Sequence, residues 1–245
     1  MGKKVAYVTG GMGGIGTAIC QRLHKDGYTV IAGCGPSRDH KKWIEEQAQQ
    51  GYTFHVSVGN VADWDSTVAA FKAVKEQHGP VSVLVNNAGI TRDGMFRKMS
   101  REDWAAVIDT NLNSLFNVTQ QVIDEMTEAG WGRIVNISSV NGEKGQFGQT
   151  NYSAAKAGMH GFTMALAQEV ANKGVTVNTV SPGYIGTEMV RAIRQDVLDK
   201  IVATIPVKRL GTPEEIASMV SWVASEEAGF ATGADFSING GLHMG

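Results

Sequence analysis

Tyr152 and Lys156 lie four residues apart in a stretch, 152–173, that the sequence predicts to be helical. Residues at this spacing share one face of a helix, so the two side chains are expected to be neighbours. A phenol with its ordinary pKa of about 10 is a poor proton donor at neutral pH. An ammonium group about 4 Å away, at an effective dielectric of about 20, stabilises the phenolate by about 4 kcal/mol, or roughly three pKa units. Such a pair could therefore exchange protons near neutral pH.

Two more polar side chains could join this pair. Ser139 follows a predicted strand 13 residues before Tyr152, and Asn111 lies within a long predicted helix, 101–129. Sites in open α/β sheets form at the carboxyl ends of the parallel strands, so Ser139 and Tyr152 are expected to converge there. For Asn111 taken alone, a hydrogen bond to nearby helical backbone is the simpler interpretation.

The scaffold for these residues is predicted by short apolar segments that alternate with longer amphipathic ones. The expected strands are 4–8, 28–34, 53–58, 81–86, 133–138, 175–180 and 234–238, and the expected helices are 14–25, 39–50, 63–78, 101–129, 152–173 and 213–225. This alternation is typical of βαβ units. It predicts one α/β domain over 1–245, a Rossmann-like, doubly wound sheet of about seven parallel strands with helices on both faces. The pattern lapses over 183–211, which we interpret as a small helical lid over the site.

Composition excludes several classes of protein. The chain has 245 residues, 42% of them hydrophobic, with 22 basic and 24 acidic side chains. This near balance argues against nucleic acid as a partner, and no apolar run approaches the roughly 18 residues that cross a membrane. Cys20 and Cys34 show neither a C-x-x-C pattern nor metal-ligand spacing, so no metal site or disulfide framework is expected. We expect a soluble, cytoplasmic protein.

Glycines crowd the first junction between a strand and a helix, in the run Thr9-Gly10-Gly11-Met12-Gly13-Gly14-Ile15-Gly16. Such a turn lets backbone approach a pyrophosphate closely, while the free N–H groups of the helix face the anion. Glycines alone would equally fit a tight turn. Their position at the first βα junction favours a dinucleotide site.

The end of the second predicted strand bears on which dinucleotide binds. An enzyme that uses NAD typically carries an acidic residue there for the ribose 2′-hydroxyl. This chain instead reads Cys34-Gly35-Pro36-Ser37-Arg38, with no carboxylate before Asp39. Arg38 could pair with a 2′-phosphate, which predicts NADPH rather than NADH. The alternative is that Arg38 is a solvated loop residue.

Across its whole length the chain resembles the classical short-chain dehydrogenase/reductase family. The matching segments are 9–16, Asn86-Asn87-Ala88-Gly89, Asn111, Ser138-Ser139, Tyr152 with Lys156, and Pro182-Gly183 followed by Thr187. One departure is Asn60-Val61, where the family usually has Asp-Val beside the adenine. The resemblance implies a cofactor site made by Gly10, Met12, Gly13, Gly14, Ile15, Gly16, Gly35, Arg38, Asn60, Val61, Asn87, Ala88, Gly89, Ile90, Thr91, Tyr152, Lys156, Pro182, Gly183, Tyr184, Ile185 and Thr187.

The same resemblance implies the roles of the catalytic residues. Hydride passes from the nicotinamide to a ketone carbon, Tyr152 protonates the developing alkoxide, and Ser139 hydrogen-bonds the carbonyl oxygen. Lys156 lowers the pKa of Tyr152 and holds the nicotinamide ribose. Asn111 positions a water molecule that relays protons to Lys156.

Within the family, 87–93 and 136–152 look most like reductases of 3-oxoacyl thioesters, and 141–152 is similar to reductases of acetoacetyl-CoA. The expected reaction is NADPH-dependent reduction of acetoacetyl-CoA to (R)-3-hydroxybutanoyl-CoA. The expected substrate-binding residues are Asp93, Gln146, Phe147, Gly148, Gln149, Tyr184 and Arg194. Phe147 could equally belong to the core. Arg191 and Arg194 could bind the phosphates of coenzyme A, or be plain surface charges.

Two other functions stay open. A reductase of acyl groups on acyl carrier protein would need a basic surface for an acidic partner, yet Asp124, Glu125 and Glu128 end the long predicted helix. A non-catalytic NADPH sensor could use the same fold, although Ser139, Tyr152 and Lys156 are all present. By resemblance alone, the chain is expected to be a homotetramer.

Overall fold

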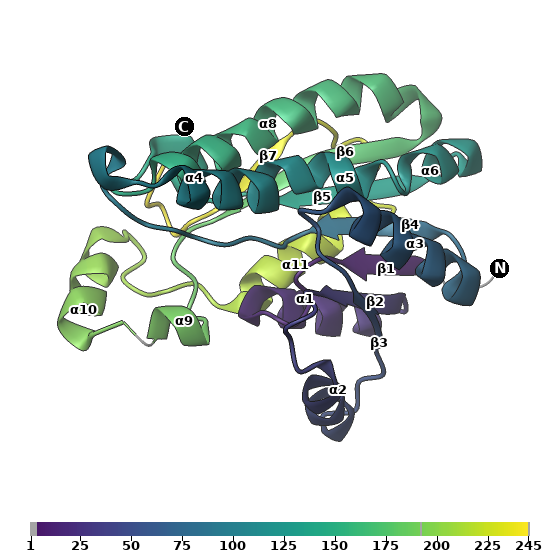
Figure 1. Cartoon of the computed structure of the whole chain (residues 1–245), viewed down its shortest axis with the longest axis horizontal. Coiled ribbons are helices and arrows are strands. Elements are labelled where there is room, and N and C mark those ends of the chain that lie inside the picture. The colour runs from purple at the N-terminus through teal and green to yellow at the C-terminus, as the bar shows by residue number, and fades with distance from the viewer. Residues whose placement is uncertain (1–3, 192, 245) are drawn as a thin grey trace.

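The structure is a computed structural model that describes residues 4–191 and 193–244, except for the side chains of Met189 and Arg191. Its centre is one parallel sheet with the strand order β3-β2-β1-β4-β5-β6-β7 (Figure 1). The strands are β1 (Val5–Val8), β2 (Thr29–Cys34), β3 (His55–Val58), β4 (Val81–Asn86), β5 (Gly132–Ile137), β6 (Val175–Pro182) and β7 (Asp235–Ile238). All seven predicted strands are confirmed, each within two residues at either end.

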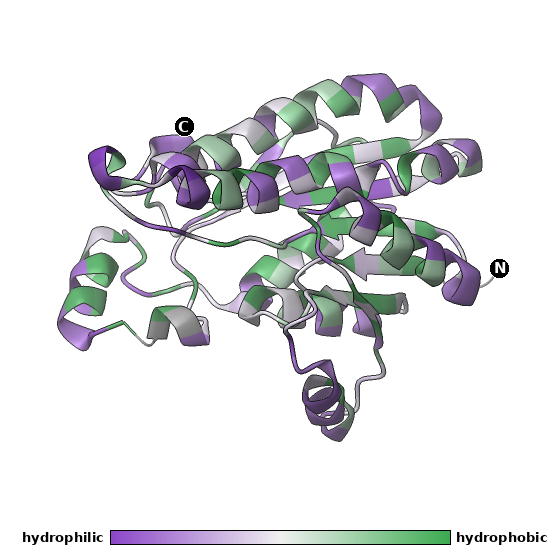
Figure 2. Cartoon of the chain, viewed as in Figure 1, coloured by the Kyte–Doolittle hydropathy of each residue, from purple (hydrophilic) through white to green (hydrophobic). Residues whose placement is uncertain are grey.

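Alternating strand residues build two apolar cores, one on each face of the sheet. In β1, Val5 and Tyr7 join one core, whereas Ala6 and Val8 join the other. Because both faces are covered, the central strands are continuously apolar, as buried parallel strands usually are. Figure 2 shows this hydrophobic centre between helices with hydrophilic outer faces.

Helices cover both faces of the sheet (Figure 1). The core that contains Ala6 is completed by α1 (Gly14–Lys25), α2 (His40–Gln49) and α11 (Pro213–Val223). The core that contains Tyr7 is completed by α3 (Trp64–His78), α5 (Ser114–Thr119), α6 (Ile123–Ala129) and α8 (Thr150–Val170). The doubly wound α/β architecture is therefore confirmed.

Several helices start where capping chemistry predicts. Ser100 accepts a hydrogen bond from the N–H of Asp103 at the start of α4 (Arg101–Ile108). Thr212 and Glu215 form a reciprocal capping box at α11, followed by Pro213 at the first helical position. These contacts satisfy backbone donors that have no partner inside the helix.

The prediction of a single long helix over 101–129 is wrong. The segment divides into α4, a π-helical turn η2 (Asp109–Asn113), α5 and α6, with a break before Ile123. Within the π-turn, the amide of Asn111 donates to the carbonyl oxygens of Val107 and Ile90, at 2.8 and 2.9 Å. A side-chain donor on a helical carbonyl competes with the regular ladder, and π-turns often mark functional positions.

Short helices that the strand and helix pattern does not predict include α7 (Val140–Lys144), the 3-10 turn η1 (Phe96–Lys98), α9 (Glu188–Arg191) and α10 (Gln195–Thr204). The 3-10 turn η3 (Ala171–Lys173) ends the helix predicted over 152–173. Figure 1 shows α9 and α10 projecting from the main body, within the segment expected to be a lid. No helix among the described residues is both long and apolar enough to cross a membrane.

Candidate active site

The glycine-rich turn connects the end of β1 to the start of α1. Gly10 has a φ of 61°, a conformation that favours glycine, and the N–H of Gly11 donates to the carbonyl of Gly33 in β2 at 2.9 Å. Gly13 precedes α1 without any side-chain cap. The N-terminal N–H groups of α1 therefore face the end of the sheet without a competing side chain, as an anion site requires.

Thr9 fastens this turn to the segment after β4. Its hydroxyl oxygen accepts the N–H groups of Asn87 and Ala88, both at 2.9 Å. In return, the amide of Asn87 donates to the carbonyls of Thr9 and Gly10, at 3.0 and 3.1 Å. The two segments meet between β1 and β4, where the strand order reverses direction and α/β sheets typically bind ligands.

Asn111 is fully buried beside Gly89 and Lys156. A Cβ atom on Gly89 would lie 2.6 Å from the Oδ1 atom of Asn111 and 3.6 Å from the Nζ atom of Lys156. The Oδ1 atom has no hydrogen-bond partner among the described residues. Buried acceptors are normally satisfied by protein or ordered water, so this atom is suited to hold a water molecule near Lys156.

Lys156 is only 3% exposed, and its ammonium donates to the carbonyl of Ile137 at 2.8 Å. Burial lowers the pKa of this group to about 7. Removing an ammonium from water disfavours its charged form, and no carboxylate compensates here. Lys156 is thereby poised to gain or lose a proton near neutral pH.

Tyr152 is hydrogen-bonded to Ser139, and the Nζ atom of Lys156 lies 5.6 Å from the centroid of its ring. The expectation that Lys156 sets the acidity of Tyr152 is wrong for this arrangement. Burial raises the pKa of Tyr152, the hydrogen bond from Ser139 lowers it, and Asp93 raises it further. Desolvation of the phenol outweighs attraction to an ammonium that is not in contact with its oxygen.

The residues expected around the adenosine are placed at the ends of β2 and β3. Arg38 is exposed, and its N–H donates to the carbonyl of Gly35 at 3.1 Å. Asn60 accepts the N–H of Ala62 through its side chain at 3.2 Å, and the carbonyl of Val61 accepts the amide of Asn117 at 3.0 Å. The structure thus keeps Asn60 in a local turn at the carboxyl end of β3.

The segment after β6 approaches the glycine-rich turn from the other side. A Cβ atom on Gly14 would lie 2.8 Å from the Cγ2 atom of Thr187, and one on Gly183 would lie 2.7 Å from the Cα atom of Asn239. Ile185 is buried and pairs with Gly211. Pro182 ends β6 opposite Ile238 of β7. Glycine is therefore required for close packing on both sides of this segment.

The residues expected to contact substrate divide into two groups. Gln149 donates to Asp93 and accepts the amide of Asn141, both at 2.9 Å, while the N–H of Gly94 donates to the carbonyl of Gly148 at 2.8 Å. This group lies close to Tyr152, because Asp93 acts on the pKa of that phenol.

The second group points outward. The side chain of Gln146 accepts a hydrogen bond from the ammonium of Lys144 at 2.9 Å. Phe147 is 82% exposed, so the alternative that it belongs to the core is wrong. Arg194 is exposed and pairs with Asp196 at 3.1 Å. The side chain of Arg191 lies outside the described residues.

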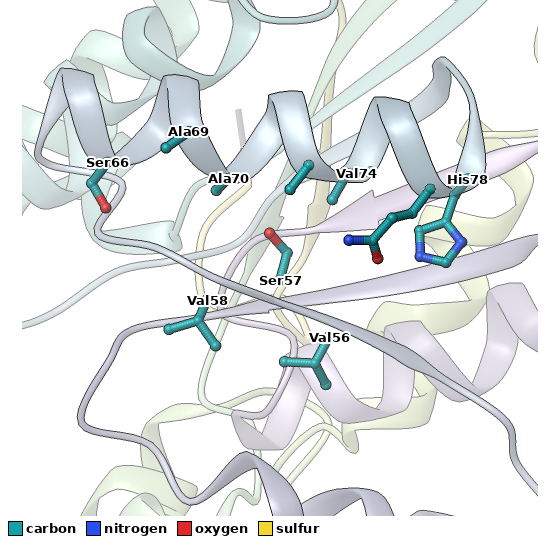
Figure 3. A pocket seen from close by; sticks show the side chains of 10 residues that line it. Val56, Ser57, Val58, Ser66, Ala69, Ala70, Val74 and His78 are labelled. Carbon is teal, nitrogen blue, oxygen red and sulfur yellow. The ribbon is translucent and has the colours of Figure 1, made fainter.

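Two cavities differ in their relation to this site. One of about 130 Å³ is lined by Gly183, Tyr184 and Ile185, together with Ile205 and Val207 from the segment that follows α10. Burial raises the pKa of Tyr184, and Asp93 raises it further, which places Tyr184 close to the predicted substrate residues. The other cavity, of about 280 Å³, lies between α3 and β3 and is lined by no predicted site residue (Figure 3).

Sequence reasoning gave no role to two residues that organise the site. The backbone N–H of Asn141 donates to the hydroxyl oxygen of Ser139, and its side-chain amide donates to Gln149. The Oδ1 atom of Asn141 is buried without a partner among the described residues. The hydroxyl of Ser138 donates to the carbonyl of Lys156 at 2.9 Å. Both residues lie within two positions of Ser139, but their types alone are too common in loops to signal a role. The described residues contain no group of three side chains suited to a metal ion.

Comparison with known proteins agrees with this geometry. Residues 4–198 match the protein family described as short chain dehydrogenase. The chain belongs to this family. Short-chain dehydrogenases are oxidoreductases that use a nicotinamide cofactor.

Three relatives show where in the short-chain dehydrogenase family the chain lies. It is 75% identical to the acetoacetyl-CoA reductase of Cupriavidus necator, with all of both chains covered. It is 55% identical to the acetoacetyl-CoA reductase of Allochromatium vinosum, over 98% of this chain and 99% of that one. Identity to the 3-oxoacyl-[acyl-carrier-protein] reductase of Pseudomonas aeruginosa is 43%, over 98% of each chain.

Proposed function

We propose that this short-chain dehydrogenase reduces acetoacetyl-CoA to (R)-3-hydroxybutanoyl-CoA with NADPH. The observation that carries the proposal is the hydrogen bond between Tyr152 and Ser139 beside Lys156, which is 3% exposed and has its Nζ atom 5.6 Å from the centroid of the Tyr152 ring. The names of the relatives with 75% and 55% identity support acetoacetyl-CoA as substrate. The (R) configuration is proposed by family resemblance.

The described residues fit a nicotinamide dinucleotide. The uncapped start of α1 and the glycine-rich turn suit its pyrophosphate, and Lys156 with the loop 87–91 would hold its nicotinamide end. Asn60 and Val61 would lie beside the adenine. The bound cofactor supplies hydride to the ketone carbon.

NADPH is proposed over NADH because of Arg38. Its guanidinium is exposed at the carboxyl end of β2, the position from which a side chain meets the ribose in this fold. Arginine suits a phosphate because its planar donors can form two parallel hydrogen bonds. The first carboxylate after β2, Asp39, is engaged as the N-cap of α2 and accepts the N–H of Lys42.

Tyr152 is the proposed proton donor. Its raised pKa keeps the phenol protonated until negative charge develops on the substrate oxygen, and Ser139 stabilises that oxygen with a hydrogen bond. After transfer, Tyr152 is left as a phenolate. A proton returns through Lys156 from a water molecule held by the Oδ1 atom of Asn111.

Substrate binding is proposed on both sides of Tyr152. Asp93, Gly148 and Gln149 would frame the acyl group, with Gln146 and Phe147 at its entrance. Tyr184 would close the other side. We propose that 183–211 is a lid within a single domain of residues 1–245, and that Arg194 exchanges Asp196 for a phosphate of coenzyme A.

Coenzyme A is preferred to acyl carrier protein because α6 is acidic. Asp124 and Glu128 are exposed there, and Glu125 forms an ion pair with Lys75. Acidic side chains on this face would repel an acidic carrier.

We also propose a homotetramer in the cytoplasm. Exposed apolar side chains on three elements support association: Phe116 of α5 at 55%, Met164 of α8 at 51% and Trp222 of α11 at 40% exposed. Cys20 and Cys34 are buried free thiols, as expected in a reducing compartment. Sedimentation of the purified protein measures its oligomeric state.

A turnover assay tests the proposed reaction. The enzyme is mixed with NADPH and acetoacetyl-CoA, or with the same acyl group on carrier protein, and NADPH oxidation is followed. We expect faster turnover of the coenzyme A thioester. Turnover restricted to the carrier-linked substrate would support the acyl carrier protein reaction, and NADPH binding without turnover of either would support a sensor.

A further inference from the structure

A polar cluster lies behind the catalytic residues, on the side of β7. The hydroxyl of Ser138 donates to the carbonyl of Lys156 and lies 3.0 Å from the Nε2 atom of His160. A hydroxyl has one hydrogen, so Nε2–H of His160 must donate to Ser138. His160 therefore supports the turn of α8 that carries Lys156.

His160 connects this turn to Asp235 of β7. Its Nδ1 atom lies 3.7 Å from the Oδ2 atom of Asp235, and the two side chains are only 21% and 22% exposed. Ser181 of β6 donates to the Oδ1 atom of Asp235 at 2.7 Å. Burial raises the pKa of Asp235, Ser181 and His160 lower it, and Glu143 raises it.

Glu143 of α7 completes the cluster. Its Oε1 atom accepts the hydroxyl of Ser237 at 2.5 Å, while its Oε2 atom is buried with no hydrogen-bond partner of its own among the described residues. Glu143 is within hydrogen-bonding contact of Asp235. Two carboxyl groups can share a hydrogen bond only if one carries a proton, and a proton on Asp235 would give that oxygen the donor it lacks.

The helix that carries Glu143 is packed against the catalytic machinery. Ser139 caps the start of α7, and a Cβ atom on Gly142 would lie 2.8 Å from the carbonyl carbon of Lys156. With so little space between α7 and α8, movement of α7 would displace both Ser139 and Lys156.

We propose that Asp235 and Glu143 share one proton and, with His160, act as positioning residues that hold Ser139 and Lys156 in their catalytic arrangement. The charged groups that act on Asp235 are Glu143 from α7 and His160 from α8; Ser181 of β6 and Ser237 of β7 add neutral donors. Loss of the shared proton places two carboxylates in contact, and their repulsion pushes α7 away from β7.

Amide and truncation variants of Glu143 separate positioning from simple stability. In Glu143→Gln the new amide still donates to Asp235 and its oxygen still accepts from Ser237, so we expect kcat within about twofold of the native enzyme. Glu143→Ala removes both contacts, and we expect kcat to fall at least about tenfold because Ser139 and Lys156 lose their catalytic arrangement. Glu169→Gln, at an exposed position on α8, is the matched control.

The pH dependence of thermal stability tests the shared proton without any substrate. A carboxyl whose pKa is raised by folding is more protonated in the folded state, so its contribution to stability falls as pH rises above about 4 toward the folded pKa. The Tm of Glu143→Gln minus that of the native protein should therefore increase from pH 5 to pH 8, while Glu169→Gln gives a flat difference.

Two results would overturn the inference: a flat Tm difference for Glu143→Gln, or a kcat for Glu143→Gln as low as that of Glu143→Ala. The kinetic arm rests on the proposed function, whereas the Tm arm does not. If the enzyme fails to reduce acetoacetyl-CoA but the Tm difference rises with pH, the proposed substrate is wrong and the shared proton stands.

Discussion

The side-chain oxygen of Asn111 occupies the space directly over Gly89 that a side chain at position 89 would need, 2.6 Å from where its Cβ would lie. This contact joins the loop after β4 to the π-helical turn. It leaves a buried acceptor close to Lys156, at the position from which a water molecule could return protons to the lysine.

Gly89→Ala should therefore impair both folding and turnover. The added methyl collides with Asn111, and overpacking of this kind costs about 1–3 kcal/mol of unfolding free energy. We expect kcat to fall more than tenfold as Asn111 is displaced. Urea unfolding and steady-state kinetics measure the two effects. Gly161→Ala, with open space around the new Cβ on α8, is the control and should not lower stability.

Tyr152→Phe should abolish turnover while keeping the fold and NADPH affinity. General acid catalysis contributes about 10²–10⁴-fold, so kcat should fall by at least that range. Fluorescence titration with NADPH should give a Kd within about threefold of the native value. Substantial remaining activity would show that another group donates the proton.

Arg38→Ala should reduce the preference for NADPH. Loss of a charged hydrogen bond to phosphate costs about 1.5–3 kcal/mol, which is about 10–100-fold in kcat/KM for NADPH. Values for NADH should change less than threefold. Equal losses for both cofactors would mean that Arg38 does not contact the 2′-phosphate. Lys41→Ala, on the neighbouring exposed turn of α2, serves as the comparison.

The buried Lys156 should make the cofactor-free enzyme more stable as pH rises. Its pKa is about 7 when folded and about 10.4 when unfolded, so the unfolded chain binds more protons between these values. Raising the pH from 7 to 9 should add about 2 kcal/mol to the unfolding free energy from this group. The gain should vanish in Lys156→Met and persist in Lys173→Met, an exposed lysine of η3. An equal gain in Lys156→Met would assign it to other groups.

The sheet was predictable from the sequence because buried parallel strands are continuous apolar runs. In this chain such runs end at or near a glycine or an asparagine. The π-helical turn within the predicted long helix was not predictable, because there the amide of Asn111 reaches the carbonyl of Ile90, 21 residues away in the chain. Helical periodicity carries no information on such a contact. The short helix α7 is similarly set by Ser139, whose hydroxyl accepts the N–H of Asn141.

The pairing of Tyr152 and Lys156 on one helical face followed from their spacing, but their electrostatics did not. The estimate of a lowered phenol pKa assumed contact between phenol and ammonium with little desolvation. In the structure the ammonium is directed to the carbonyl of Ile137, and burial raises the pKa of Tyr152. Burial of each group depends on the packed fold, which spacing alone does not reveal.

Thr9 lies at the end of the first strand, yet its hydroxyl is engaged by Asn87 and Ala88, which follow the fourth. The glycine-rich turn thus depends on chain that is synthesised some eighty residues later. A fragment that ends before β4 would contain every glycine of that turn and still lack the groups that hold it in shape. Affinity for the dinucleotide should accordingly arise late in folding, together with the completed sheet.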